Sequence, residues 1–129
     1  MSVAAAPPLP GFPDQPPASN QCQVVEQNPL DYTVMAPDTV FTPVWVLENT
    51  GDTTWNEEDY DMRYLASSGG PLHLGPDVND LVIPTEPGWT YGLTMTMITP
   101  YTPGTYREAW SIVHGNQTIC VYWLIIEVR

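Results

Sequence analysis

The sequence contains no lysine, and its only basic side chains are Arg63, Arg107 and Arg129. They are opposed by 15 aspartates and glutamates, so the formal net charge is −12. Because a surface of this charge repels phosphate groups, we expect no binding to DNA, RNA or anionic lipid. A run of about 18 apolar residues is also lacking, so no segment is expected to insert into a membrane. The N-terminus has no basic region followed by a long apolar one, so it does not have the pattern of an intact secretory signal.

Histidine is scarce as well, which removes much catalytic and metal-binding chemistry. His73 and His114 have no Cys, His or Asp at metal-ligand spacing, and we expect each to be hydrogen-bonded or solvent-facing. The sequence has neither a Gly-x-Ser-x-Gly elbow nor a phosphate-binding glycine loop. We therefore expect a protein that is not an enzyme and that needs no metal or cofactor.

Two local patterns leave alternatives open. The acidic stretch from Glu57 to Asp61 lacks the Asp-x-Asp-x-Asp-Gly pattern of a calcium loop, so solvated charge is favoured over a calcium site. Asn116 begins an Asn-x-Thr triplet that fits the glycosylation pattern, although such triplets are common by chance.

The chain has only two cysteines, Cys22 and Cys120. They lie near the first and last predicted strands, which are neighbours in many β-sandwiches. A disulfide between them would close a loop of about 100 residues, worth about 4–5 kcal/mol in the chain-entropy model. The alternative is two buried thiols in a cytosolic protein. The composition favours the disulfide, and with it an extracellular or cell-surface location.

Short strand patterns separated by turn residues make up most of the sequence. Phe41, Trp45 and Leu47 alternate with β-branched residues, which predicts a strand with one well-packed face. A turn at 49–52 follows, and Thr53-Thr54-Trp55 then restart the strand. Further strands are expected at 22–25, 31–35, 62–65, 79–83, 89–98, 105–113 and 118–128, with brief pairing at 72–74. About seven to eight strands without a 3.6-residue apolar period predict an all-β sandwich over residues 22–129.

Two of these strands have unusual side-chain patterns. Glu108 falls on the apolar face of the strand at 105–113, where its charge requires Arg107, Arg63 or backbone donors as partners. The last strand, 118–128, is apolar on both faces, which predicts a central strand covered from both sides.

Residues 1–21 form a nearly uncharged segment rich in proline and alanine. Proline fixes φ and donates no hydrogen bond, so we expect an extended arm or linker rather than a packed element. Val3, Leu9 and Phe12 are its apolar residues, and we expect them to contact another subunit or a partner more than their own domain.

From Phe41 the sequence reads F-T-P-V-W-V-L-E-N-T-G, and Thr54-Trp55 follow. This resembles the F-x-x-x-W-x-x-x-N-x-G…W signature of the FW (four-tryptophan) domain. The second half agrees in order and spacing through Pro87-Gly88, Pro100, Pro103-Gly104-Thr105-Tyr106-Arg107, Trp110, Gly115 and Trp123. The resemblance covers about residues 30–128. Trp89 has no counterpart in the pattern, and Thr118-Ile119 stands where the family usually has Phe-Gly.

The resemblance implies an immunoglobulin-like sandwich that binds other proteins and has no catalytic role. Such modules occur in selective-autophagy cargo receptors and in bacterial extracellular proteins. The expected structural core is Phe41, Trp45, Trp55, Tyr106, Trp110 and Trp123. We therefore expect an extracellular protein-interaction or adhesion module. One alternative is a self-assembling subunit of a filament or surface layer built through the arm. The other is a carbohydrate-binding module with Trp89 in an exposed aromatic platform.

Overall fold

The structure, a computed structural model, describes residues 20–129. The arm residues Val3, Leu9 and Phe12 therefore lie outside the described part. Within it the strands are β1 (Cys22–Asn28), β2 (Thr33–Met35), β3 (Val40–Phe41), β4 (Val44–Asn49), β5 (Tyr60–Ser68), β6 (Val78–Asp80), β7 (Thr90–Thr94), β8 (Met97–Ile98), β9 (Gly104–His114) and β10 (Gln117–Val128). Residues 20–129 contain no helix long and apolar enough to cross a membrane.

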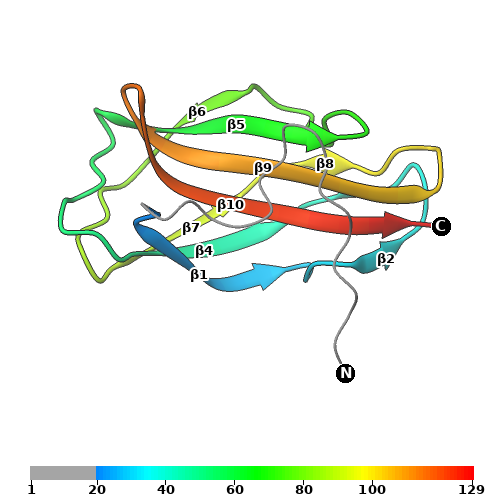
Figure 1. Ribbon diagram of the computed structural model, residues 1–129, viewed down its shortest axis with the longest axis horizontal. Coiled ribbons are helices and arrows are strands. Elements are labelled where there is room, and N and C mark those ends of the chain that lie inside the picture. Colours follow the sequence, from blue (N-terminus) through cyan, green and yellow to red (C-terminus); the bar gives the residue numbers. More distant parts are fainter. Residues whose placement is uncertain (1–19) are drawn as a thin grey trace.

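The strands form two main sheets, as predicted for a sandwich (Figure 1). One has the order β1-β4-β7, the other has the order β2-β10-β9-β5-β6, and β3 and β8 form a short third pair. β1, β4 and β7 take the places of immunoglobulin strands A, B and E, and β5, β9 and β10 take those of C, F and G. Tyr106, near the start of β9, donates its hydroxyl to the carbonyl of Thr102 at 2.5 Å, which is the tyrosine corner of such domains.

The expected single strand at 89–98 is wrong in one respect, because the chain changes partners partway along it. β7 pairs with β4, whereas β8 pairs with β3. Between them, the carbonyl of Thr96 accepts from the Leu74 amide, and Met97 bridges to His73. The brief pairing expected at 72–74 is therefore present. The strand expected at 79–83 is shorter, and in the structure covers Val78–Asp80.

The core lies between the two sheets, and three of the expected tryptophans are its largest members. Trp45, Trp55 and Trp110 are each at most 1% exposed. Phe41 is half-buried against the same cluster, and Tyr106 is buried within it.

Trp123 was predicted to be a core residue, and this prediction is wrong, because its side chain is only half-buried. Its neighbours Tyr122 and Leu124 occupy the inward positions on β10, and alternation along a strand then turns Trp123 to the opposite face. Its backbone carbonyl still contacts the core, where it accepts a hydrogen bond from the Trp45 indole at 3.2 Å.

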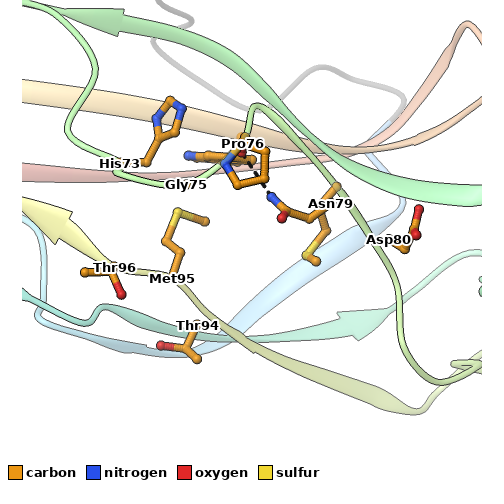
Figure 2. A pocket seen from close by; sticks show the side chains of 10 residues that line it. His73, Gly75, Pro76, Asn79, Asp80, Thr94, Met95 and Thr96 are labelled. Atoms are coloured by element: carbon orange, nitrogen blue, oxygen red, sulfur yellow. Dashed lines mark hydrogen bonds between the residues drawn. The ribbon is translucent and has the colours of Figure 1, made fainter.

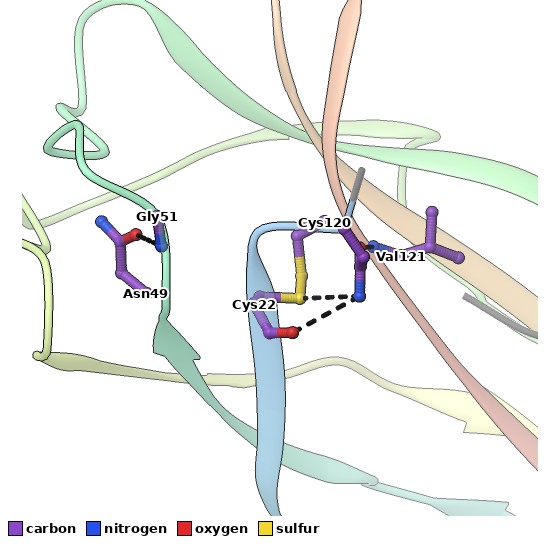
Figure 3. Close-up of a disulfide and its surroundings, with 6 residues drawn as sticks. Cys22, Asn49, Gly51, Cys120 and Val121 are labelled. Carbon is purple, nitrogen blue, oxygen red and sulfur yellow. Dashed lines mark hydrogen bonds between the residues drawn. A yellow bond between two sulfur atoms is a disulfide. The ribbon is translucent and has the colours of Figure 1, made fainter. Parts of the chain in front are cut away.

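The predicted disulfide joins Cys22 of β1 to Cys120 of β10 (Figure 3). The two Cα atoms are 5.4 Å apart, within the range that a disulfide can span. Because β1 and β10 belong to different sheets, the bond ties the two layers together at one end of the sandwich.

Candidate functional site

A pocket of about 330 Å³ opens between an edge strand of one main sheet and an edge strand of the other. β6 is the outer strand of the larger sheet and β7 that of the smaller one. Figure 2 shows Met95 pointing from the β7–β8 connection toward the segment that carries His73 and Pro76. The lining residues are Met62, His73, Gly75, Pro76, Asn79, Asp80, Thr94, Met95, Thr96 and Trp110.

Beneath this pocket lies the carboxylate of Glu108, which is fully buried. Its Oε1 accepts the Leu72 amide at 2.6 Å, and its Oε2 accepts the Trp110 indole N–H at 2.8 Å. Nδ1 of His73 lies 2.9 Å from the same Oε2. Of the partners that the sequence required for Glu108, the structure shows a backbone donor, the Leu72 amide, and it adds two side-chain partners that were not predicted, His73 and Trp110.

His73 is held from both sides. Its Nε2 lies 2.7 Å from the Asp77 carboxylate, and its side chain is 4% exposed. Burial by itself would lower the pKa of the imidazole, but hydrogen bonds to Asp77 and Glu108 and the charges of both carboxylates outweigh burial and raise this pKa above its usual value. The ring also packs edge-on against Trp110, with centroids 5.0 Å apart.

The side chains around this pocket offer apolar contacts and hydrogen-bonding groups. Both ring nitrogens of His73 are engaged, so the imidazole is not presented as a base or nucleophile. Two methionines offer flexible, polarisable walls, and the threonines, Asn79 and Asp80 offer hydrogen-bonding groups at the rim. Among residues 20–129 no cluster of three or more His, Cys, Asp or Glu side chains could hold a metal ion.

One rim residue is involved in a like-charge pair. Asp80 of β6 lies opposite Asp61 of β5. Burial, a hydrogen bond to Asp80 and the charge of Asp80 raise the pKa of the Asp61 carboxyl, against a smaller opposing effect of Arg63. The rim is therefore acidic, as is the chain as a whole.

Comparison with known proteins now identifies the domain. The family described as the Ig-like domain from next to BRCA1 gene matches residues 28–128. The chain belongs to this family. It is 30% identical over 95 residues to the Next to BRCA1 gene 1 protein of Mus musculus, and 27% identical over 110 residues to the Protein NBR1 homolog of Arabidopsis thaliana.

Those alignments take in 72% and 81% of this chain but only 9% and 15% of the two relatives. The chain thus spans a small part of the curated relatives that it matches. Among solved structures, the CARDB domain of a Pyrococcus furiosus protein is similar, with a TM-score of 0.55 at 16% identity, covering 88% of this chain and 94% of that domain. That likeness concerns the fold alone.

Two residues of the family signature, Asn49 and Gly51, lie in the turn after β4 and do not line the pocket. The side chain of Asn49 is fully buried; it donates to the carbonyls of Thr53 and Thr85, both at 2.9 Å, and accepts the Gly51 amide at 3.0 Å. A Cβ on Gly51 would lie 2.7 Å from the Gln21 side chain. The Asn49 side chain therefore holds the turn after β4, and the Thr50 amide ties this turn to the carbonyl of Gln21, directly before β1.

The structure places the other residues chosen from sequence at separate sites. Trp89 is 55% exposed and lies directly before β7, where its carbonyl accepts the Asn49 amide. His114 stacks on Tyr60, with centroids 4.6 Å apart. Glu57 and Asn116 are exposed in turns.

Sequence reasoning did not assign Met62, Met95, Asn79 and Asp80 to a site. Met95 was only a position in the strand expected at 89–98, and Asn79 and Asp80 were only positions in the strand expected at 79–83. The one signal in the sequence that could have located this site was Glu108, a charged residue on an apolar strand face. A buried carboxylate requires hydrogen-bond donors, so it indicates a polar cluster nearby.

Proposed function

We propose that this domain is a non-catalytic, extracellular protein-interaction or adhesion module that holds a segment of a partner protein in the pocket between β6 and β7. The observation that carries the proposal is the pocket itself. Its methionine walls and polar rim rest on a His73–Glu108 cluster whose side chains are fixed by hydrogen bonds. Rigid support of this kind reduces the entropy lost when a partner binds.

The charge of the domain indicates the chemistry of the partner. A net charge of −12 and the acidic side chains Asp77 and Asp80 beside the pocket disfavour acidic segments. The segment that fits best places an apolar side chain between Met62 and Met95 and carries lysine or arginine on one side. The Cys22–Cys120 disulfide supports the extracellular part of the proposal, because such bonds persist in oxidising compartments.

Selection from a displayed library of short random peptides tests the proposal. We expect enriched peptides to combine an apolar anchor with a basic neighbour, and to lose binding when Thr96→Tyr fills the pocket. Thr90→Tyr is the matched control. Thr90, the first residue of β7, is an exposed threonine like Thr96, but it does not line the pocket. Equal binding of the selected peptides to both variants would contradict the proposal, as would the absence of enrichment over Thr96→Tyr.

The glycan alternative has less support. The exposed aromatic rings of residues 20–129 are Trp89 and Tyr101, at 55% and 78% exposure. Trp89 precedes β7 and Tyr101 follows β8, so the chain between them runs along the sandwich and separates the two rings. They do not form one platform. Self-assembly is measured directly by sedimentation velocity of the full chain.

A further inference from the structure

The outer edge of β7 presents backbone groups that no strand of residues 20–129 pairs with. β7 ends the sheet order β1-β4-β7, so β4 is its single neighbour in that sheet. The Asn49 amide donates to the Trp89 carbonyl on the side of β4, and alternate residues of an antiparallel strand turn their backbone groups to the same side. By this alternation the groups of Gly92 and Thr94 point away from β4. Outside the ladder with β4, no backbone group of residues 20–129 hydrogen-bonds to either residue.

The chain itself pairs with the same side just beyond β7. Segment 72–74 runs antiparallel beside β8, and the Leu74 amide donates to the Thr96 carbonyl at 3.0 Å. The next residue that this pattern would pair is Pro76, opposite Thr94. Proline has no amide hydrogen to donate, so the pairing stops there. The open part of the edge therefore begins at the pocket, which Pro76 and Thr94 both line, and runs along β7.

β7 is the least protected edge of the two main sheets. Such edges are usually protected by charged side chains, prolines, bulges or short strands. β1 has an irregular register between Val24 and Glu26, and β2 and β6 have three residues each. β7 has five residues, none charged and none proline, and its register with β4 is regular. A Cβ on Gly92 would meet no atom of residues 20–129 within 4 Å, so a second backbone can approach closely.

We propose that the partner segment described above binds as an added β-strand along the outer edge of β7; this inference rests on the proposed function. In constant-type immunoglobulin domains strand D lies beside strand E. β7 takes the place of E, and no strand of residues 20–129 takes that of D beside it. The partner segment occupies this place. Backbone hydrogen bonds to Gly92 and Thr94 provide affinity, and the pocket provides specificity for one of the alternate side chains.

The residues around this edge determine the sequence that the added strand needs. Leu93 of β7 faces inward, and Met95, two positions later, lines the pocket. A side chain of the added strand level with them enters the pocket, whereas its sequence neighbours point outward. Figure 2 shows Thr94 and Met95 on one side of the pocket and Asn79 and Asp80 on the other. A lysine or arginine two positions from the apolar anchor lies on the same face and reaches Asp80.

Charge favours a segment of another protein over a second copy of this chain. Residues Thr90–Thr94 contain no basic side chain, so a second β7 has none to place beside Asp80. Each domain also has a net charge of −12, and two such domains repel each other at close range. The occupant is therefore an extended segment of a partner protein, with an apolar anchor, a basic residue and no proline at the paired positions.

Hydrogen exchange measured by NMR on the full chain tests the pairing, with a peptide selected as described above. In the free domain the amides of Gly92 and Thr94 should exchange rapidly, whereas those of Tyr91 and Leu93, paired with β4, should exchange slowly. Free peptide at about 100 times its Kd should slow exchange at Gly92 and Thr94 by about 100-fold. A peptide that Thr96→Tyr excludes but that leaves these two amides unprotected would overturn strand pairing alone. Failure to select any pocket-dependent peptide would overturn the proposed function as well.

Replacement of Gly92 tests the same edge by affinity. Gly92→Pro removes one amide that faces the added strand, and we expect peptide binding to weaken by about tenfold or more. Gly92→Ala keeps the amide and has room for its Cβ, so it should weaken binding much less. Equal affinities of the two variants would contradict the proposal.

Two measurements on the unmodified chain do not depend on the folding of Gly92→Pro. N-methylation of the selected peptide at every second residue should weaken binding by about tenfold or more, whereas methylation at the residues between should be tolerated, because alternate amides of a strand face its neighbour. A uniform effect would overturn strand pairing. Sedimentation velocity should show a monomer, and a dimer that the selected peptide dissociates would place a second copy on this edge and overturn the assignment.

Discussion

Replacement of Glu108 tests the buried cluster beneath the pocket. The carboxylate is fully buried and accepts hydrogen bonds from the Leu72 amide, the Trp110 indole and the His73 ring. Glu108→Ala leaves these donors without their acceptor. A single unsatisfied buried group costs about 1–3 kcal/mol. The costs do not add simply, and removal of one partner of a buried pair costs about 3–5 kcal/mol in total, which is the loss we expect in the free energy of unfolding.

Glu108→Gln is the matched control, because it keeps the shape and one acceptor oxygen. That oxygen can still accept the Leu72 amide, whereas the new NH₂ group faces the Trp110 and His73 donors. We expect a smaller loss, about 1–3 kcal/mol. Urea unfolding followed by circular dichroism measures both variants. If Glu108→Ala lies within about 0.5 kcal/mol of the unmodified chain, the size expected for a surface change, the account of the cluster is refuted.

The free energy of unfolding should also depend on pH, and Glu108→Gln should change this dependence. The folded-state pKa of His73 is raised above its unfolded value of about 6.5. The protonated imidazole therefore adds stability that is fully present below pH of about 6.5, and that is lost as pH rises through the folded pKa. Glu108→Gln removes one of the two carboxylates responsible, so the loss with rising pH should be smaller. An unchanged dependence in Glu108→Gln would contradict this assignment.

Three other substitutions test separate parts of the structure. Trp45→Ala should lower the free energy of unfolding by about 3–5 kcal/mol, because a large core side chain is removed; an unchanged denaturation midpoint would show that Trp45 is not an anchor. Asn49→Ala should cost about 1–3 kcal/mol, since two carbonyls and an amide lose their partner, and hydrogen exchange should increase in the loop at 50–55 rather than in β9. Asp61→Asn should stabilise by a few tenths of a kcal/mol at pH 7 by relieving the pair with Asp80. Because the folded pKa of Asp61 is raised, this gain should vanish in acid, where the carboxyl is already protonated, and a gain equal at both pH values would argue against the charge pair.

Much of the fold was predictable because strand patterns are local. The period-two placement of Trp45 and Leu47 identified the inward face of β4, and the same pattern identified Trp110 in β9. The two cysteines near the ends of the domain predicted the disulfide. The resemblance to the family signature supplied the immunoglobulin-like class, and its Asn49 does hold the turn after β4 through three hydrogen bonds.

The tertiary structure alone decided the rest. β10 is apolar at successive positions, so its sequence does not say whether Trp123 or its neighbours face the core; this depends on register with β9, including the irregularity between Thr118 and Cys120. The partner of Glu108 is His73, 35 residues earlier, and no spacing rule links them. The pocket exists because the edges of two sheets meet there, and contacts between edges arise from how the whole chain folds rather than from any segment of it.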